Sequence, residues 1–245
     1  MIVFIHIGKT GGTTIDRLLR GKLENYREYH LNIKYKSADE EYIIWLRNPI
    51  SRFVSAFNHS LYAVRKDVST MKTFNLKTCL LPYWLEKKKT RGFTFSKKYD
   101  DLVKLFKSPN DLAEALSSSD TNLKSLAVNL MNMECEHLFK GIGWYLDNGV
   151  FVNKNNSRIR FVGRLENMKE DIAKLSLELG ISLNSELFLR ENVYVDKSLK
   201  SLSPLAITNI VEWYKETDYK ALKVLNKKGW VSDETLKSYY TYNND

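Results

Sequence analysis

The chain has 245 residues, of which 43% are hydrophobic and 27% are charged, a composition typical of one globular domain with a sizeable core. No apolar run approaches the roughly 18 residues that a membrane-spanning helix needs, and the first residues lack the pattern of a signal peptide. We therefore expect a single domain over residues 1–245, cytoplasmic and without a membrane span. The formal net charge of +9 favours an anionic ligand, although no nucleic-acid-binding module is recognisable.

The first predicted element is a strand over 2–7, a continuous apolar run typical of a strand buried in a parallel sheet. The glycine-rich stretch GKTGGTT follows at 8–14, and from Thr13 onward apolar residues recur at helical spacing. A strand, a glycine turn and a helix form the first half of a βαβ unit.

The turn at 8–14 has the chemistry of an anion-binding loop. Backbone N–H groups at a helix N-terminus attract anions, and the helix dipole adds to this attraction. The candidate binding residues carry a positive charge, a hydroxyl group, or no Cβ atom that would keep a ligand from the backbone: Lys9, Thr10, Gly11, Gly12, Thr13 and Thr14. The lysine precedes the glycine pair, so the spacing differs from the G-x-x-x-x-G-K-[ST] loop of ATP-binding proteins.

A second strand is predicted over 42–46, followed by a helix that Asn48 caps and Pro49 opens. In open α/β sheets, ligands bind at the carboxyl ends of the strands. Arg47 lies at such an end and can hold an anion through two hydrogen bonds, and Ser55 adds a hydroxyl from the helix. These two residues predict a second anion site beside the first.

The stretch over 67–110 is basic and interrupted by prolines, which predicts an irregular insertion over the sheet edge. The later predicted elements are, in chain order, helices over 111–116 and 123–131, a strand over 159–162, a helix over 165–179 that ends at Gly180, and a last helix that begins at Ser203 and Pro204. The pattern as a whole predicts an α/β protein with a small parallel sheet. Cys79 and Cys135 have no metal-ligand spacing and the four histidines are scattered along the sequence, so we expect no disulfide and no metal site.

Two stretches, HIGKTGGTT and LRNPISRFVS, resemble motifs of the sulfotransferases that use 3′-phosphoadenosine 5′-phosphosulfate (PAPS). The first resembles their 5′-phosphosulfate-binding loop and the second their 3′-phosphate-binding motif. Both are most similar to the carbohydrate O-sulfotransferases, in particular the heparan sulfate 6-O-sulfotransferase type. The later segments TNLKSLAVNLM, FVGRLENMKEDI and WYKETDYKAL are also similar to parts of the superfamily. The resemblance implies a P-loop-NTPase-like parallel sheet flanked by helices, and PAPS as the donor that leaves as 3′,5′-ADP.

The same resemblance implies a role for each motif residue. Lys9 would contact the bridging oxygen and the sulfonate, and stabilise the charge that develops on the leaving phosphate. Thr10 to Thr14 would hold the 5′-phosphate, while Arg47 and Ser55 would hold the 3′-phosphate and select PAPS over ATP. A hydroxyl would then attack sulfur in line, without a metal, while a general base takes its proton.

The two motifs do not identify the residue that acts as the general base. The resemblance implies a histidine or a glutamate after the first motif, and His30 lies in a comparable interval. An imidazole also titrates near neutral pH, which suits a general base. Four alternatives stay open at this point: Glu24, Glu28, His59 and His137. His6, inside the first strand, is predicted to be a buried, hydrogen-bonded structural residue.

Further predictions concern other charged residues, which are expected to form ion pairs or contact the nucleotide. A solvent-facing ion pair with nearby acids is a reasonable interpretation for Arg52. Arg164, at the end of the third predicted strand, either reaches the nucleotide or pairs with Glu166. Lys197 and Lys200 are candidates for further contacts with the 3′-phosphate.

The predicted acceptor is a hydroxyl of a carbohydrate or a small metabolite. The basic segment 86–98 could attract an acidic saccharide, and Trp84 or Trp144 could stack on a neutral sugar. The membrane anchor and lumenal disulfides of the Golgi enzymes are not recognisable, which favours a compact bacterial or viral form. Two other functions remain open: a P-loop kinase, and a non-catalytic protein that binds an anionic polymer.

Overall fold

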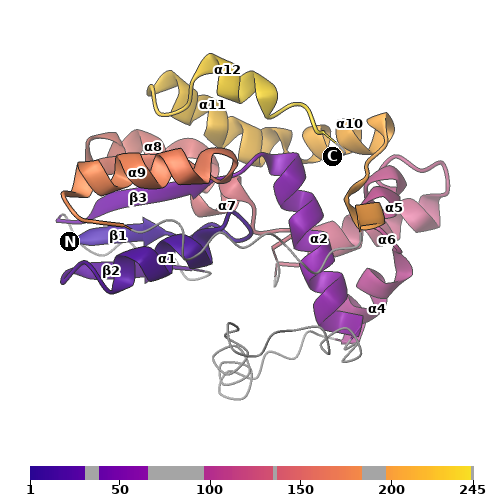
Figure 1. Cartoon of the computed structure of the whole chain (residues 1–245). Helices are drawn as coiled ribbons and strands as arrows, with labels where there is room; N and C mark the ends of the chain where they lie inside the picture. The colour runs from indigo at the N-terminus through magenta and orange to yellow at the C-terminus, as the bar shows by residue number, and fades with distance from the viewer. Residues whose placement is uncertain (31–38, 66–96, 135–136, 184–196, 244–245) are drawn as a thin grey trace.

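A parallel β-sheet lies between helices in one half of the molecule, on the left in Figure 1. The computed structural model describes residues 1–30, 39–65, 97–134, 137–183 and 197–243. Within these ranges one four-stranded sheet has the strand order β2-β1-β3-β4, and every neighbouring pair is parallel. The strands are β1 (Ile2–Ile5), β2 (Tyr26–Tyr29), β3 (Glu41–Leu46) and β4 (Ile159–Arg164).

Helices cover both faces of this sheet. Those in the described part of the chain are α1 (Gly12–Arg20), α2 (Pro49–Arg65), α4 (Lys97–Leu105), α5 (Pro109–Ala115), α6 (Thr121–Met131), α7 (Ile142–Tyr145), α8 (Val150–Asn155), α9 (Met168–Leu179), α10 (Pro204–Tyr214), α11 (Lys220–Lys227) and α12 (Asp233–Ser238). A π-helical turn over Lys215–Tyr219 joins α10 to α11. Short 3₁₀ turns occur at Asp147–Gly149, Asn156–Arg158, Leu165–Asn167 and Lys197–Lys200. The prediction of an α/β fold with a parallel sheet flanked by helices is confirmed.

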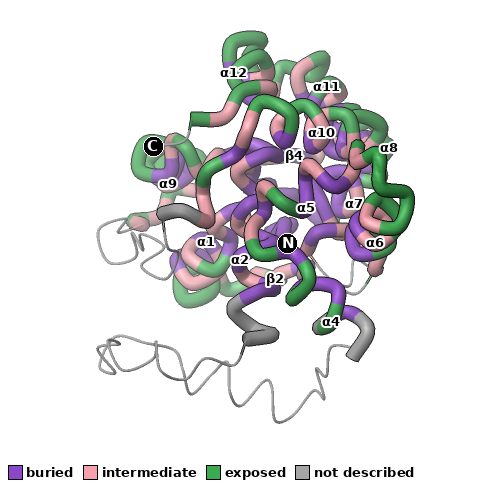
Figure 2. Tube along the Cα trace, turned by 90° about the vertical axis from the view of Figure 1, so that its right-hand side faces the viewer, coloured by how far each residue is buried: buried purple, intermediate pink, exposed green. Residues whose placement is uncertain are grey.

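The two faces of the sheet belong to two separate hydrophobic clusters, because successive side chains of a strand point to opposite sides. Phe4, Ile43 and Trp45 pack with α1 and α9. Ile5 and Ile44 point the other way, into the larger cluster that contains residues of α2, α7, α8, α10 and α11. Figure 2 shows this distribution, with buried residues in the middle of the molecule and exposed ones on the outer sides of the helices.

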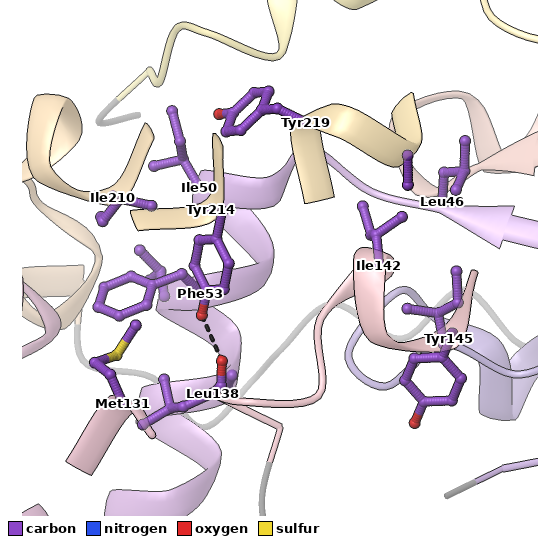
Figure 3. Packing of buried hydrophobic residues seen from close by; sticks show 14 of the residues in the cluster. Leu46, Ile50, Phe53, Met131, Leu138, Ile142, Tyr145, Ile210, Tyr214 and Tyr219 are labelled. Carbon is purple, nitrogen blue, oxygen red and sulfur yellow. Dashed lines mark hydrogen bonds between the residues drawn. The ribbon is translucent and has the colours of Figure 1, made fainter. Parts of the chain in front are cut away.

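Helix α2 begins at the carboxyl end of β3 and runs past the end of the sheet toward α4 (Figure 1). Its buried face includes Ile50 and Phe53, which lie close to Ile210 and Tyr214 of α10 (Figure 3). The Tyr214 hydroxyl donates a hydrogen bond to the main-chain oxygen of Leu138 at 2.6 Å. The segment before α7 is therefore tied to the same core as α2 and α10.

Several predicted helix boundaries are confirmed by their caps. The side-chain oxygen of Asn48 accepts hydrogen bonds from the N–H groups of Ile50 (2.8 Å) and Ser51 (3.3 Å) at the start of α2. Gly180 ends α9 with a φ of 62°, a left-handed conformation that suits glycine. The Ser203 hydroxyl accepts from the third residue of α10.

Three elements differ from the prediction. Strand β2 was not predicted, since its sequence YREY has no apolar run, and α12 follows the helix that was expected to be the last. The prediction of an irregular segment over 67–110 is wrong for its final part, because Tyr99, Val103 and Phe106 are buried at helical spacing and α4 forms there. Residues 66–96 of that segment lie outside the described residues.

None of the helices in the described ranges is long and apolar enough to cross a lipid bilayer.

Candidate active site

The loops that follow β1 and β3 lie side by side because these two strands are neighbours in the sheet. The guanidinium Nη1 of Arg47, just after β3, donates a hydrogen bond to the main-chain oxygen of Lys9, just after β1, at 3.1 Å. This contact brings together the two motifs for which anion binding is predicted. They occupy the carboxyl end of the sheet, where ligands of α/β proteins bind.

The loop after β1 makes a tight turn into α1. Lys9 and Gly11 have positive φ values of 71° and 83°, a left-handed conformation that is uncommon for a lysine. A Cβ atom on Gly11 would also lie 2.8 Å from side-chain atoms of Leu165 and Met168, so position 11 requires glycine. The N-cap position of α1 is Gly11, which has no side chain to accept from the N–H groups of the first turn. These N–H groups are of the kind that bind anions at helix N-termini.

The three threonines of the loop have different environments. Thr10 is fully buried and its hydroxyl donates to the main-chain oxygen of Ile7 at 2.8 Å, so this side chain stabilises the turn. Thr13 is exposed and Thr14 is partly exposed, in the first turn of α1. Of the predicted threonine ligands, these two have side chains that reach the surface of the loop.

The glycines on either side of the lysine make room for histidine rings. A Cβ atom on Gly8 would lie 2.3 Å from Nδ1 of His137, and one on Gly12 would lie 2.1 Å from Cδ2 of His6. The sequence predicts that the missing Cβ of Gly12 lets a ligand approach the backbone. In the structure an imidazole ring of the protein lies at that position.

All four histidines of the chain lie in one row of rings beside the loop, although the sequence analysis treated them as scattered. The ring centroids of His6 and His30 are 4.2 Å apart, those of His30 and His137 are 5.8 Å apart, and those of His137 and His59 are 5.7 Å apart. We call this set the histidine row. Among the described residues, no three His, Cys, Asp or Glu side chains are grouped so as to hold a metal ion.

His30 lies inside the row and its tautomer follows from its neighbour. Its Nδ1 is 2.8 Å from the main-chain oxygen of His6. A carbonyl oxygen can only accept a hydrogen bond, so Nδ1 carries the hydrogen and the lone pair of the neutral ring is on Nε2. The hydroxyl of Tyr145, in α7, is 3.4 Å from the same Nδ1. No motif in the sequence marks Tyr145 as part of the site.

The other end of the row is electrically neutral. The positive charge of Lys9, together with burial, lowers the pKa of His59 to about 3. Burial, with further contributions from His59 and Lys9, lowers the pKa of His137 well below the usual histidine range. Both rings are therefore unprotonated at neutral pH, and both lie within electrostatic range of the lysine.

Arg47 and Ser55 are the two residues that are predicted to form the second anion site. Burial lowers the pKa of Arg47, while Glu166 and Tyr242 act in the opposite direction, and a guanidinium stays protonated in proteins. Ser55 is partly exposed on α2, one turn before His59, so that the two side chains share one face of the helix.

Arg52 is buried and does not face solvent, which corrects the interpretation drawn from the sequence. Its Nη1 donates to the main-chain oxygen of His137 at 2.8 Å, and its Nε lies 3.5 Å from a carboxylate oxygen of Asp218 in the π-helical turn. The guanidinium also lies over the ring of Tyr214, 5.4 Å from its centroid. Arg52 thus holds the segment of His137 against α2 and α10.

Arg164 pairs with Asp171 and not with Glu166. The Asp171 carboxylate accepts from the Arg164 main-chain N–H at 2.8 Å and lies 3.5 Å from its Nε. Glu166 instead accepts from the N–H of Asn48 at 2.7 Å and from the hydroxyl of Tyr239 at 3.2 Å. Both residues therefore stabilise the end of the sheet.

The remaining candidates contribute little to this region. Glu24 is exposed in the turn before β2. The ring of Trp144 packs edge-on against Tyr145, with the ammonium group of Lys140 4.9 Å from its centroid. The main-chain oxygen of Lys200 accepts from the Tyr242 hydroxyl at 2.6 Å. Trp84, the side chain of Lys197 and nearly all of the basic segment 86–98 lie outside the described residues.

A family comparison covers nearly the whole chain. The model of the sulfotransferase family matches residues 1–228. The match includes both motifs for which anion binding is predicted and all four histidines. No curated protein and no solved structure matches the chain significantly.

Proposed function

The chain belongs to the sulfotransferase family, a family of enzymes that transfer sulfonate groups, and on this premise we propose that its donor is PAPS and its acceptor a hydroxyl of a carbohydrate or small metabolite. The observation that carries this proposal is the hydrogen bond between Arg47 and the main-chain oxygen of Lys9. It holds two predicted anion-binding motifs together at the carboxyl end of the sheet. PAPS has phosphate groups at two separate positions, whereas ATP has no 3′-phosphate for the second motif to bind.

The side chains at this end of the sheet fit such a nucleotide chemically. Lys9, the first-turn N–H groups of α1, and Thr13 and Thr14 would bind the 5′-phosphosulfate. Arg47 and Ser55 would bind the 3′-phosphate. PAPS supplies an activated sulfonate when bound, and Lys9 would stabilise the negative charge that develops on the departing phosphate oxygen.

Among the candidate bases the environments favour His30. His59 and His137 are weak bases because the charge of Lys9 and burial lower their pKa values. Glu28 is already hydrogen-bonded to two other side chains through its two oxygens. His30 has its lone pair on Nε2, as its bond to the main-chain oxygen of His6 requires.

The proposed step is a direct transfer between two oxygens. The acceptor oxygen forms a bond to sulfur while the bond between sulfur and the bridging phosphate oxygen breaks. The proton of the acceptor hydroxyl goes to Nε2 of His30, and Lys9 stays next to the leaving oxygen. The products are the sulfated acceptor and 3′,5′-ADP.

Calorimetric titration tests the choice of donor directly. The purified protein is titrated with 3′,5′-ADP, with 5′-AMP and with ATP in the presence of Mg²⁺. We expect the tightest binding for 3′,5′-ADP, because only this nucleotide occupies both anion sites. A panel of saccharides and small hydroxyl compounds is then incubated with ³⁵S-labelled PAPS to find the acceptor. A preference for ATP over 3′,5′-ADP would contradict the proposal.

A further inference from the structure

A carboxylate lies behind the histidine row, on the edge strand of the sheet. One oxygen of Glu28 accepts a short hydrogen bond from Nδ1 of His6, and the other accepts from Nη2 of Arg20 at 3.0 Å. Both partners of the first bond are largely shielded, with exposed side-chain fractions of 11% for His6 and 19% for Glu28. Arg20 also binds Asp16 at 2.8 Å.

The register of the parallel ladder produces this arrangement. Phe4 pairs with Glu28 and Ile5 with Tyr29, and the N–H of His6 donates to the main-chain oxygen of Tyr29 at 3.0 Å. Residues two apart in a strand point to the same face. Glu28 is therefore on the α1 side of the sheet, the side on which the His6 ring meets the loop at Gly12.

His6 holds His30 in two ways. Its main-chain oxygen accepts the hydrogen bond from Nδ1 of His30, and its ring stacks on that of His30 with an interplanar angle of 30°. A displacement of the His6 ring would therefore change the plane of His30 and so weaken the hydrogen bond that Nδ1 of His30 donates to the main-chain oxygen of His6. Glu28 thus contacts His6, and His6 contacts His30, in one continuous chain of side chains and main chain.

We propose that Glu28 and His6 are positioning residues for His30: Glu28 orients the ring of His6, and His6 fixes His30 in the tautomer that accepts a proton at Nε2. This inference rests on the proposed function, since it assumes that His30 is the base. Glu28 itself takes up no proton, because both of its oxygens already accept hydrogen bonds.

The charge of Glu28 gives the pair a second effect. Burial raises the pKa of Glu28, but the hydrogen bond from His6 and the fields of His30 and Arg20 outweigh this effect, so that the pKa is lowered and the group is ionised. A negative charge one ring away stabilises the imidazolium that His30 becomes during transfer.

Within the part of the chain that the structure describes, the other titratable or charged groups around His30 come from four elements or segments. They are His6 after β1, Glu28 in β2, Arg20 in α1 behind Glu28, and His137 and Tyr145 in and before α7. His137 is neutral at working pH, for the reasons given above. Arg20 offsets part of the negative charge, so the net effect of Glu28 on His30 is moderate.

The test replaces Glu28 by glutamine, which keeps the size and one of the two acceptor oxygens and removes the charge. Glu170→Gln, at an exposed position in α9, is the matched control. Two-dimensional ¹⁵N–¹H NMR of the histidine rings, in protein without nucleotide, reports the tautomer and the titration midpoint of His30. We expect Glu28→Gln to lower this midpoint by about 0.5–1 pH unit and to raise the fraction of the Nε2–H tautomer.

Kinetics give the second readout. With PAPS and a working acceptor, Glu28→Gln is expected to lower kcat about tenfold and to leave the Kd of 3′,5′-ADP within about twofold. The acid limb of the kcat/KM profile should move to lower pH by the same amount as the NMR midpoint. Glu28→Asp, which keeps the charge, should recover part of kcat even if the glutamine variant folds poorly.

His6→Phe keeps the stacked ring and the main-chain oxygen but removes the bond to Glu28. The double variant with Glu28→Gln should lose no more activity than either single variant, because both changes break one chain of contacts. The inference is overturned if Glu28→Gln matches Glu170→Gln in midpoint, tautomer and kcat. Full activity of His30→Ala would instead overturn the proposed base, while the NMR result would still report the effect of Glu28 on His30.

Discussion

Each imidazole of the histidine row has its own neighbours, and the neighbours decide what the ring can do. His59 lies near the positive charge of Lys9 and is kept neutral. His6 donates to a carboxylate, and His30 donates to a main-chain oxygen. One residue type therefore occurs as a neutral ring, as a donor to a carboxylate and as the proposed proton acceptor within a single row.

Replacing His30 by alanine tests its role as the base. We expect kcat to fall by about 10²–10⁴-fold, the usual contribution of a positioned base, while the Kd of 3′,5′-ADP changes little. The measurement is turnover of labelled PAPS together with calorimetry. His59→Gln is the comparison variant. If His30→Ala stays active and His59→Gln instead loses about 10²–10⁴-fold in kcat, the base is His59.

Arg47 has one observed contact and one proposed function, and a comparison of two nucleotides can separate them. Arg47→Ala removes a cation from the proposed 3′-phosphate site and also the hydrogen bond to the main-chain oxygen of Lys9. We expect 3′,5′-ADP to bind about 10–100-fold more weakly, as for a lost charge-assisted hydrogen bond of about 1.5–3 kcal/mol. The affinity for 5′-AMP, which lacks the 3′-phosphate, should change much less. An equal loss for both nucleotides would mean that Arg47 acts by holding the loop.

At the scale of elements, α2 is fixed by a buried ion pair. Arg52 and Asp218 have side chains that are 0% and 1% exposed, and removing one partner leaves the other charge buried and unpaired. We expect Arg52→Ala to lower the free energy of unfolding by about 3–5 kcal/mol, measured by urea denaturation.

Two surface ion pairs of Arg160 supply the control for this stability prediction. Arg160 binds Glu41 and Glu178 with 38% of its side chain exposed, so Arg160→Ala should cost about 0–1 kcal/mol. The double variant Arg52→Met with Asp218→Leu should recover much of the loss, because no charge is left unpaired. An equal cost for Arg52→Ala and Arg160→Ala would contradict a structural role for the buried pair.

Elements with a buried face could be predicted from the sequence, and elements that depend on distant partners could not. The apolar runs at 2–7 and 42–46 mark β1 and β3 because the side chains of these central strands are buried on both faces of the sheet. The run at 159–162 marks β4, an edge strand whose side chains are mostly partly exposed. Strand β2 is an edge strand that pairs with one neighbour and alternates polar and aromatic residues. Its pattern is too short and too polar to be distinguished from a turn.

The candidate site also contains residues that could be predicted from local motifs and residues that could not, because their contacts are distant in the sequence. The loop and Arg47 are local motifs that the sequence displays. The histidine row forms only when β1, β2, α2 and the segment before α7 meet, so nothing in the spacing of His59 and His137 marks their contact. The burial of Arg52 depends likewise on Asp218, far along the chain.

At the scale of the whole molecule, the neutral histidines make folding sensitive to acid. The unfolded chain protonates His59 near pH 6.5, whereas the folded protein does so only at about 3. The unfolded state therefore binds more protons between these values, and the stability that is fully present above pH 6.5 is lost as the pH falls toward 3. His137, with its pKa also lowered, acts in the same direction.

We expect the free energy of unfolding to fall by about 1.4 kcal/mol per pH unit for each such histidine below pH 6. Urea denaturation at intervals between pH 5 and pH 7.5 measures the slope above the range in which carboxylates titrate. His59→Gln should reduce the slope by about 1.4 kcal/mol per pH unit. An unchanged slope would mean that His59 gains its proton in the folded state at an ordinary pH.

The two glycines that admit His137 and His6 have a consequence for how this loop can be inherited or transplanted. A Cβ at either position would collide with an imidazole, so neither glycine can be replaced while the facing ring stays in place. If the stretch GKTGGTT is grafted into another phosphate-binding protein, the spaces beside Gly8 and Gly12 stay unfilled unless the host also supplies the two histidine rings. Among relatives, we expect a larger residue at position 8 or 12 only where position 137 or 6 has lost its ring.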